Sequence, residues 1–222
     1  MGVSERREKE KIIRKNDIVQ AAIKLFFEKG VENTTMDDIA KKAEYTKRTI
    51  YFYFNSKESI LAAVLSKGYE IINNLVERYI FEVKDKNSIE KMFAVGRAYI
   101  YFYKEHREFL NMINNYRTKE PDITLGDENI KELYFLADKQ SFYLSEIITS
   151  GIKEGSFRKD LNPEEAVLLI WSCFVGISNL LLNKSDYLKM YKENTPENLL
   201  NMMNNLIYNY LTSSDYKIIN NL

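Results

Sequence analysis

Two cations in the N-terminal quarter of the chain each stand four residues before an aromatic side chain. Lys47 is paired in this way with Tyr51, and Arg48 with Phe52. Residues four apart lie on the same side of a helix, and a purely solvated face rarely carries such aromatics. Cations and hydroxyls at a helix start suit a polyanion, because free backbone amides and the positive end of the helix dipole add to their charge. This stretch therefore predicts recognition of a polyanion.

The elements that must position these side chains are two short helices joined by a tight turn, predicted between Thr34 and Phe54. Thr35 followed by Asp38 forms a capping box for the first helix, and Thr46 can cap the second. Two short helices with a turn between them match the helix-turn-helix, whose second helix enters the major groove of DNA. We therefore expect residues 46–52 to be the recognition surface.

The run FFEKGVENTTMDDIAKKAEYTKRTIYFYFNSKESIL resembles the N-terminal region of the tetracycline-repressor-like (TetR) family of bacterial regulators. The resemblance covers roughly Ile18 to Leu65 without a gap. Glu44 stands where a glycine usually ends the first helix of the motif, and a non-glycine residue with positive φ is strained. Arg48 stands where a glycine often occurs, and it adds a candidate donor to base edges.

The predicted DNA contacts divide into those to bases and those to phosphates. The base contacts are expected at Lys47, Arg48 and Phe52, and the phosphate contacts at Thr35, Thr46, Tyr51 and Lys57. Lys57 is favoured both by the family resemblance and by its place at the start of a helix. The alternative is a pair of ordinary helices whose exposed Lys, Arg and Tyr side chains only face solvent.

The charge of the whole chain does not by itself indicate a nucleic-acid-binding protein. The 222 residues carry a formal net charge of +0, so any nucleic-acid footprint must come from local asymmetry. The N-terminus has such an asymmetry, with Glu8 and Glu10 opposed by Arg6, Arg7, Lys9, Lys11, Arg14 and Lys15. This segment is either an arm that follows phosphates or a frayed, solvated terminus.

The composition and the spacing of apolar residues predict an all-α protein. Gly and Pro are few, at 8 and 3 residues, and no linker rich in them separates the halves. We expect an N-terminal arm and three-helix helix-turn-helix DNA-binding domain over 1–56, and a larger C-terminal helical domain for effector binding and dimerisation over 57–222. Helices are expected over about 57–83, from Ser88, over about 109–116, over about 128–154, from Pro163 and from Pro196, with an irregular loop over 117–127.

Family resemblance implies a homodimer and a ligand cavity in the C-terminal domain. Helices near 163–183 and 195–212 would form a four-helix interface with their symmetry mates. The cavity would lie among the middle helices, with these aromatic candidates: Tyr99, Phe102, Tyr103, Tyr116, Phe142, Tyr143, Trp171 and Phe174. They are alternatively plain core. In the helix over about 128–154, the inward residues are predicted to be Leu133, Leu136, Phe142, Leu144, Ile147 and Ile148.

Several other classes of protein are disfavoured. Cys173 is the sole cysteine, so no intrachain disulfide can form, and His106 is the sole histidine, so no metal-ligand spacing occurs. His106 is expected at the end of a helix. No catalytic motif, phosphate loop or cofactor is indicated, so the chain is not predicted to be an enzyme. Without a signal peptide, and with the run 166–182 too polar to span a bilayer, we expect a cytoplasmic protein without membrane contact.

The resulting hypothesis is a homodimeric transcriptional regulator, most simply a repressor. It would bind a near-palindromic double-stranded DNA operator until a small apolar or aromatic effector releases it. One alternative is a DNA-binding dimer with a solid core and no effector. Another is a helical enzyme or scaffold that has kept the fold and lost DNA binding.

Overall fold

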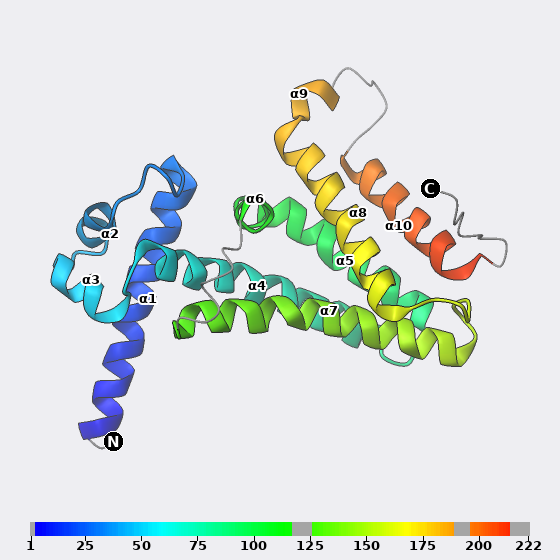
Figure 1. Ribbon diagram of the computed structural model, residues 1–222, viewed down its shortest axis with the longest axis horizontal. Coiled ribbons are helices and arrows are strands. Elements are labelled where there is room, and N and C mark those ends of the chain that lie inside the picture. The colour runs from blue at the N-terminus through cyan, green and yellow to red at the C-terminus, as the bar shows by residue number, and fades with distance from the viewer. Residues whose placement is uncertain (1–2, 117–125, 189–195, 214–222) are drawn as a thin grey trace. The chain divides into compact units, whose positions relative to one another are not determined.

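The computed structural model describes residues 3–116, 126–188 and 196–213 (Figure 1). Within these ranges every regular element is a helix, so the predicted all-α fold is confirmed. The helices are α1 Val3–Lys29, α2 Met36–Lys42, α3 Lys47–Tyr53, α4 Lys57–Glu82, α5 Ser88–Glu105, α6 Arg107–Asn115, α7 Glu128–Glu154, α8 Pro163–Asn183, α9 Ser185–Leu188 and α10 Pro196–Thr212. The predicted loop over 117–127 lies mostly outside the described residues.

The first of two compact units contains the described residues of 1–69 and 117–136. In it α1 packs against α2, and α2 against α3 (Figure 1). Because apolar residues recur at helical spacing, each helix turns one stripe inward. The resulting core includes Ile18, Ala22, Phe26, Ile39, Ala40, Ile50, Phe54, Ile60 and Val64. The first turns of α4 and α7 belong to this unit, where the Asn129 amide donates to the Ser59 hydroxyl over 2.9 Å.

The N-terminal basic segment is helical in the structure, since α1 begins at Val3 and runs without interruption to Lys29. It is therefore not frayed over the described residues, and its role in following phosphates stays a prediction. Gly30 follows with φ of 81°, the left-handed conformation in which glycine ends a helix at little cost.

The second unit contains the described residues of 70–116 and 137–222. In it α5 packs against α6 and α10, and α8 packs against α6 and α10. Polar bonds fasten helix ends together: the backbone N–H of Ser88 donates to Glu154 over 3.1 Å, and Lys104 pairs with Glu197 at 2.7 Å. Between α6 and α8, Asn114 donates to Ser178 over 2.8 Å. The short α9 was not predicted.

One predicted inward residue of α7 faces outward. Phe142 is 61% exposed, whereas Leu133 and Leu144 are buried. Successive residues of an α-helix are separated by about 100°, so Phe142 lies roughly opposite both Leu133 and Leu144. The prediction grouped residues that helical geometry keeps apart, and it is wrong for Phe142.

The helix α8 is apolar on two sides, and one of them is uncovered. Its start is well formed, because Asn162 accepts from the backbone N–H groups of Glu164 and Glu165 and Pro163 takes the first helical position. The buried side includes Ile170 and Phe174. The other side exposes Leu168, Leu169 and Trp171, and the neighbouring α10 exposes Met202 and Leu206.

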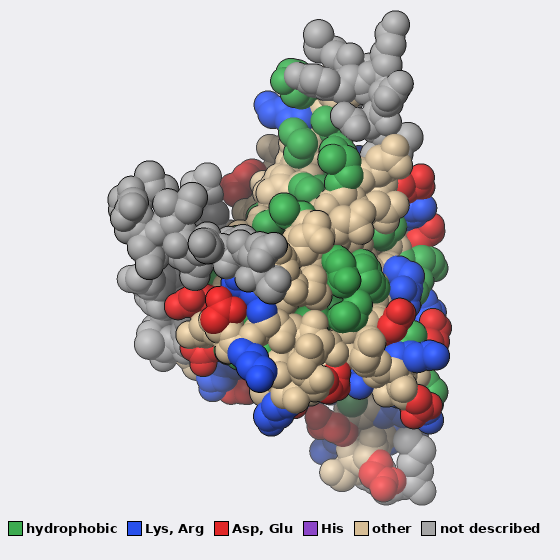
Figure 2. Space-filling view, turned by 90° about the vertical axis from the view of Figure 1, so that its right-hand side faces the viewer, with side chains coloured by type: hydrophobic (Ala, Val, Ile, Leu, Met, Phe, Trp, Pro, Cys, Tyr) green, Lys and Arg blue, Asp and Glu red, His purple; other side chains and the backbone are tan. Residues whose placement is uncertain are grey.

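Figure 2 looks from the side on which α10 lies in Figure 1, and it shows hydrophobic side chains in patches among uncharged ones, with most charged side chains nearer the margins.

Contrary to the sequence prediction, α8 is long and apolar enough to cross a membrane. This is weak support for a membrane span, because core helices of soluble proteins pass the same test of length and composition.

Candidate functional site

The helix α2 begins at the predicted capping box, which is confirmed. The Thr35 hydroxyl accepts from the Asp38 backbone N–H at 3.1 Å, and the Thr35 N–H donates to the Asp38 carboxylate at 2.9 Å. Lys29, in the last turn of α1, donates to the same carboxylate oxygen at 2.8 Å. The Lys29 ammonium and then the Thr35 amide hold the pKa of Asp38 well below its usual range, because they bond to its charged form. This cluster joins α1 to the start of α2.

The turn between α2 and α3 contains the strained residue that the sequence indicates. Glu44 has φ of 60°, so it adopts the left-handed conformation in which a glycine would be unstrained. The turn is nevertheless hydrogen-bonded, because the Tyr45 N–H donates to the carbonyl of Ala40 at 3.0 Å. The Tyr45 hydroxyl also donates to Asp17 of α1 at 2.9 Å. The second bond ties the turn before α3 to α1.

The helix α3 has a buried side and an exposed side. Ile50 is 0% exposed and Phe54, just beyond the helix, is 1% exposed. By contrast Phe52 is 76% exposed, although a large aromatic side chain gains free energy from burial. The side chains exposed on or beside α3 are Thr46, Lys47, Arg48, Tyr51 and Phe52, and we call them the DNA-reading surface. The structure therefore brings five of the seven predicted contacts together on one short element.

Lys47 is already paired within this region. Its Nζ lies 2.9 Å from Oδ1 of Asp37 on α2, and the hydrogen bond to Asp37 raises the pKa of the Lys47 ammonium. Both side chains are more than half exposed, so solvent screens this pair strongly. If Lys47 contacts a base, the base would therefore replace the Asp37 carboxylate as the partner of its ammonium group.

The two predicted phosphate contacts outside α3 have structural roles as well. Thr35 is exposed but serves as the N-cap of α2. Lys57, at the start of α4, is half-buried and donates to the backbone carbonyl of Val31 at 2.9 Å. Because an ammonium group has three donor hydrogens, this bond leaves a phosphate contact by Lys57 as a prediction.

The basic N-terminal part of α1 forms a stripe that continues its buried face. Arg7, Lys11 and Arg14 precede Ile18 by eleven, seven and four residues, spacings that place them on the side of the helix where Ile18 is buried. Farther along, the Lys15 ammonium lies 5.8 Å from the centre of the Phe54 ring. The stripe carries acidic partners too, because Arg14 pairs with Glu10 at 2.5 Å.

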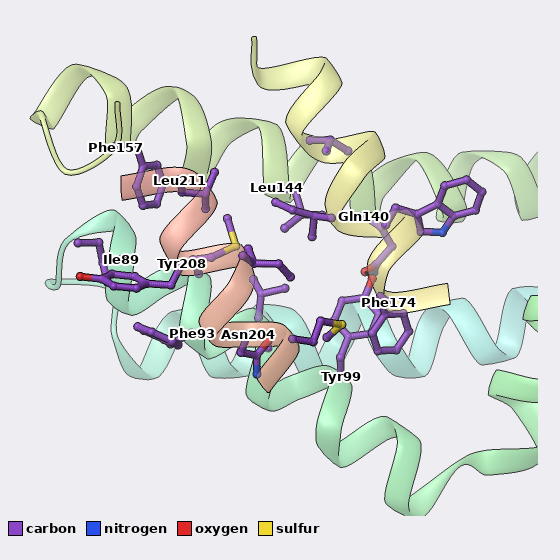
Figure 3. A pocket seen from close by; sticks show the side chains of 18 of the residues that line it. Ile89, Phe93, Tyr99, Gln140, Leu144, Phe157, Phe174, Asn204, Tyr208 and Leu211 are labelled. Atoms are coloured by element: carbon purple, nitrogen blue, oxygen red, sulfur yellow. Dashed lines mark hydrogen bonds between the residues drawn. The ribbon is translucent and has the colours of Figure 1, made fainter. Parts of the chain in front are cut away.

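The second unit contains an apolar cavity among α5, α7, α8 and α10, which we call the effector cavity (Figure 3). Its free volume is about 60 Å³, far below the roughly 300–1,000 Å³ of typical ligand pockets. It is lined by Ile89, Met92, Phe93, Val95, Gly96, Tyr99, Gln140, Ser141, Leu144, Phe157, Val167, Ile170, Trp171, Phe174, Met203, Asn204, Ile207, Tyr208 and Leu211.

The cavity brings together three of the eight aromatic residues that the sequence singled out. Tyr99, Trp171 and Phe174 line it, and the rings of Tyr99 and Phe174 lie 4.1 Å apart between centroids. The other five lie outside its lining: Phe102, Tyr103, Tyr116, Phe142 and Tyr143. Of these, Phe102 and Tyr103 are buried in the core of the second unit, and Tyr143 donates to Glu77 on α4.

Polar residues in the lining were missed by sequence reasoning. Gln140 and Asn204 point into the cavity from α7 and α10 (Figure 3). The signal that could have found Gln140 is its place two turns before Ile147 on α7, where an amide interrupts an otherwise apolar stripe. Asn204 was not singled out, because α10 contains several other asparagines and the sequence does not show which one points inward.

No group of three or more metal-ligating side chains is found among the described residues. His106 lies between the end of α5 and the start of α6, as predicted. Cys173 is half-buried on α8.

Residues 18–64 match the sequence pattern of bacterial regulatory proteins of the tetR family. These residues form the helix-turn-helix and its supports. By this match, the N-terminal region is similar to tetR-family regulators. The predicted resemblance is thereby confirmed, and with it the arrangement of an N-terminal helix-turn-helix followed by a larger helical domain.

A curated relative covers most of the chain. The HTH-type transcriptional repressor NicS of Pseudomonas putida is 28% identical over 167 residues, which are 74% of this chain and 76% of that protein.

Two solved structures share the fold. FadR from Bacillus subtilis, in complex with stearoyl-CoA, has a TM-score of 0.65 at 20% identity and covers 86% of this chain and 96% of its own. AibR, in complex with isovaleryl coenzyme A and operator DNA, has a TM-score of 0.61 at 21% identity and covers 88% of this chain and 98% of its own. At these identities the likeness concerns the fold alone.

Proposed function

We propose that this protein is a tetR-family transcriptional repressor that binds a near-palindromic DNA operator as a homodimer. The observation that carries the proposal is the DNA-reading surface, which exposes Lys47, Arg48, Tyr51 and Phe52 from a helix anchored by a buried Ile50. Arg and Lys are suited to the acceptor edges of guanine in the major groove, and an exposed aromatic ring to the methyl group of thymine. NicS, a relative, is named as a transcriptional repressor.

We propose that the exposed apolar sides of α8 and α10 form the dimer interface, within the ranges 163–183 and 195–212. Trp171, Met202 and Leu206 are 57%, 62% and 61% exposed. Large apolar side chains gathered on neighbouring helices favour a protein partner, and a twofold axis lets one patch cover its own copy. The two reading helices would then have to lie about 34–36 Å apart to enter successive major grooves.

The proposed release signal is a small molecule in the effector cavity. Two structures with the same fold were solved with acyl-CoA ligands, FadR with stearoyl-CoA and AibR with isovaleryl coenzyme A. The helix α4 contributes residues to both compact units, so a ligand that favours a different position of α4 would change operator affinity. The size of that change is limited by the difference between the ligand's affinities for the two forms. A soluble, cytoplasmic location accords with this function.

The small free volume of the cavity supports a second candidate function, a DNA-binding dimer with no effector. About 60 Å³ is less than a drug-sized ligand needs. Under this alternative no small molecule changes operator affinity. Measuring operator affinity with a ligand that binds the second unit distinguishes the two candidates.

Operator selection followed by mutation of the reading helix tests the proposal. The operator is first selected from a random duplex library, and affinities are then measured by fluorescence anisotropy. Lys47→Ala or Arg48→Ala is expected to weaken operator binding by about 1–3 kcal/mol if a base is read. Lys153→Ala, an exposed cation on α7, is the charge-matched control and should leave the affinity unchanged. Unchanged affinity in both single variants and in their double variant would contradict the proposal.

The salt dependence of the same binding reaction tests the phosphate contacts. Each phosphate neutralised by a cation lowers the slope of log affinity against log salt by about 0.9, because counterions are released. If the basic stripe on α1 contacts the phosphates of the DNA backbone, the double variant Arg7→Ala, Lys11→Ala makes the salt slope less steep. The change is expected to correspond to the loss of up to about two phosphate contacts. An affinity that hardly varies with salt would favour the scaffold that has lost DNA binding.

A further inference from the structure

Among the described residues, those that line the effector cavity carry no carboxylate, ammonium, guanidinium or imidazole group. Its polar lining consists of uncharged groups on Tyr99, Gln140, Ser141, Asn204 and Tyr208, together with the indole of Trp171. An ion moved into such a site keeps no compensating charge, so its burial is strongly unfavourable. The lining therefore selects against ligands that carry their charge into the cavity.

A hydrogen-bonded group of polar side chains lies at one end of the cavity (Figure 3). There the Tyr99 hydroxyl donates to Oε1 of Gln140 over 2.5 Å, and Nε2 of Gln140 donates to Oδ1 of Asn73 on α4. Phe157, Leu211 and Ile89 lie toward the opposite end (Figure 3). The cavity thus has a hydrogen-bonded group at one end and mainly apolar side chains at the other, where Tyr208 stacks on Phe93.

The carboxamide of Gln140 suits an uncharged head group that both donates and accepts hydrogen bonds. A carboxamide offers two donor hydrogens and two acceptor lone pairs, and the bonds to Tyr99 and Asn73 use one of each. A primary amide or an alcohol can supply complementary partners. A carboxylate has only acceptors, and a quaternary ammonium has neither donor nor acceptor, so each would be buried with its charge unmatched.

Two flexible side chains in the lining can make room for a ligand. Met92 and Met203 line the cavity, and their unbranched thioether side chains change rotamer more readily than branched ones. Since the cavity holds about 60 Å³ before any ligand enters, these side chains have to move for a ligand to bind.

We propose that the effector is an uncharged amphiphile whose polar head binds Gln140 and whose apolar body lies toward Phe157 and Leu211. This inference rests on the proposed effector site and names its ligand class. It sets this chain apart from the two related structures with acyl-CoA ligands, because coenzyme A carries phosphates. Gln140 is the residue that determines specificity.

The same contact supplies a route from the ligand to the DNA-binding region. Asn73 is 2% exposed, so an effector that draws Gln140 away removes one hydrogen bond from a buried side chain, which is unfavourable. The helix α4, which carries Asn73, also contributes its first turns to the DNA-binding unit. An effector head at Gln140 therefore favours a different environment for α4.

Probes of one chain length and different head groups test the proposal. Octanamide, octanoate, octyltrimethylammonium and octanoyl-CoA are titrated into the full chain at neutral pH, with binding followed through Trp171, which lines the cavity and is the sole tryptophan. Octanamide is expected to bind at least about tenfold more tightly than each charged probe, because a factor of ten needs only a small part of the burial penalty of a charge. Equal or tighter binding of octanoate or octanoyl-CoA overturns the proposal, as does a failure of octanamide to saturate.

Two variants and a control locate the head group. Gln140→Leu removes the carboxamide and Tyr99→Phe removes only a hydroxyl, so the second variant keeps the test valid if the first does not fold. Each is expected to reduce the preference for octanamide over octanoate by at least about fivefold. Phe142→Ser changes an exposed residue outside the lining and should leave the preference unaltered; an unaltered preference in both lining variants overturns the proposal. Operator affinity of the ligand-free protein is measured separately, so a failure of DNA binding is not confused with a wrong ligand class.

Discussion

The DNA-reading surface and the effector cavity are built in opposite ways. The first is an exposed face of the seven-residue helix α3 and its N-cap, and one of its cations, Lys47, already pairs with Asp37. The second lies mainly among four helices, and the described residues that line it carry no charge. One site is suited to a large anion that stays in water, and the other to a small ligand that leaves water.

This difference shows why one site is local and the other is not. Every residue of the DNA-reading surface falls between Thr46 and Phe52, so a single helix with one buried stripe positions them all. The cavity residues run from Ile89 to Leu211, and their meeting depends on how long helices pack. Changes to the cavity region should therefore act through packing, and changes to the reading region through charge and turn geometry.

A charge on the exposed apolar face of α10 should have the largest effect, although it lies far along the chain from α3. Leu206→Glu places a carboxylate in the proposed interface, once from each copy. Because an unpaired buried charge costs several kcal/mol, we expect a monomer and an operator affinity at least about a hundredfold weaker. Light scattering after size-exclusion chromatography and anisotropy measure these changes. Phe142→Glu is the control, since Phe142 is also 61% exposed but lies on α7; a dimeric Leu206→Glu protein would refute the interface.

Adding one methyl group to α7 should have the next largest effect. A Cβ on Gly151 would lie 2.2 Å from the ring of Phe157, which is 3% exposed. Gly151→Ala is therefore expected to lower the free energy of unfolding by about 1–3 kcal/mol through overpacking, measured by urea denaturation. Phe157→Leu in the same background should recover part of the loss, since the two changes share a contact. Additive losses would argue against the clash.

Acid should weaken the reading region through Asp38. Its pKa is lowered in the folded protein, so the carboxylate stabilises the fold above its ordinary pKa of 3.8, and that contribution is lost as the pH falls from there through the lowered value. Asp38→Asn should therefore reduce the urea midpoint at neutral pH, and its difference from the wild type should shrink below pH 3.8. A difference that is constant over this range would exclude an electrostatic origin. The uncharged cavity lining should show no such dependence for octanamide.

Relief of backbone strain should have the smallest effect. Glu44 has φ of 60°, and a glycine there avoids the steric cost of the left-handed conformation but loses more entropy on folding. Glu44→Gly is expected to raise the free energy of unfolding by up to about 1 kcal/mol. Glu44→Ala is the matched control, because it removes the charge and keeps the strained Cβ. A similar gain in both variants would assign the effect to charge.

Sequence reasoning predicted the parts of the fold that depend on neighbours along the chain. The capping box at Thr35, the cap at Thr46, the ends of α7 and the start of α8 at Pro163 were all indicated by the residues next to them, and the structure has them. A cap needs side-chain and backbone groups only two or three residues apart, so a local pattern is sufficient.

The same reasoning was weaker wherever partners are distant in sequence. The apolar residues of α7 show which residues avoid water, but not that Phe142 lies opposite Leu144 and stays exposed. Aromatic content suggested eight cavity residues, of which Tyr99, Trp171 and Phe174 line it. Gln140 was missed because its importance comes from a meeting with Tyr99 and Asn73, 41 and 67 residues away.

If Lys47 reads a base as proposed, its ion pair with Asp37 has a consequence for the search along a chromosome. Lys47 is paired with the Asp37 carboxylate before it meets DNA. The binding free energy that it gains in a groove is therefore only the difference between the new partner and Asp37. A random stretch of duplex offers a phosphate at best, and the exchange is then nearly even. Lys47 gains net binding free energy only from a base edge that interacts with its ammonium better than Asp37 does. The ion pair with Asp37 therefore shortens the time spent on non-operator DNA more than the time spent on the operator.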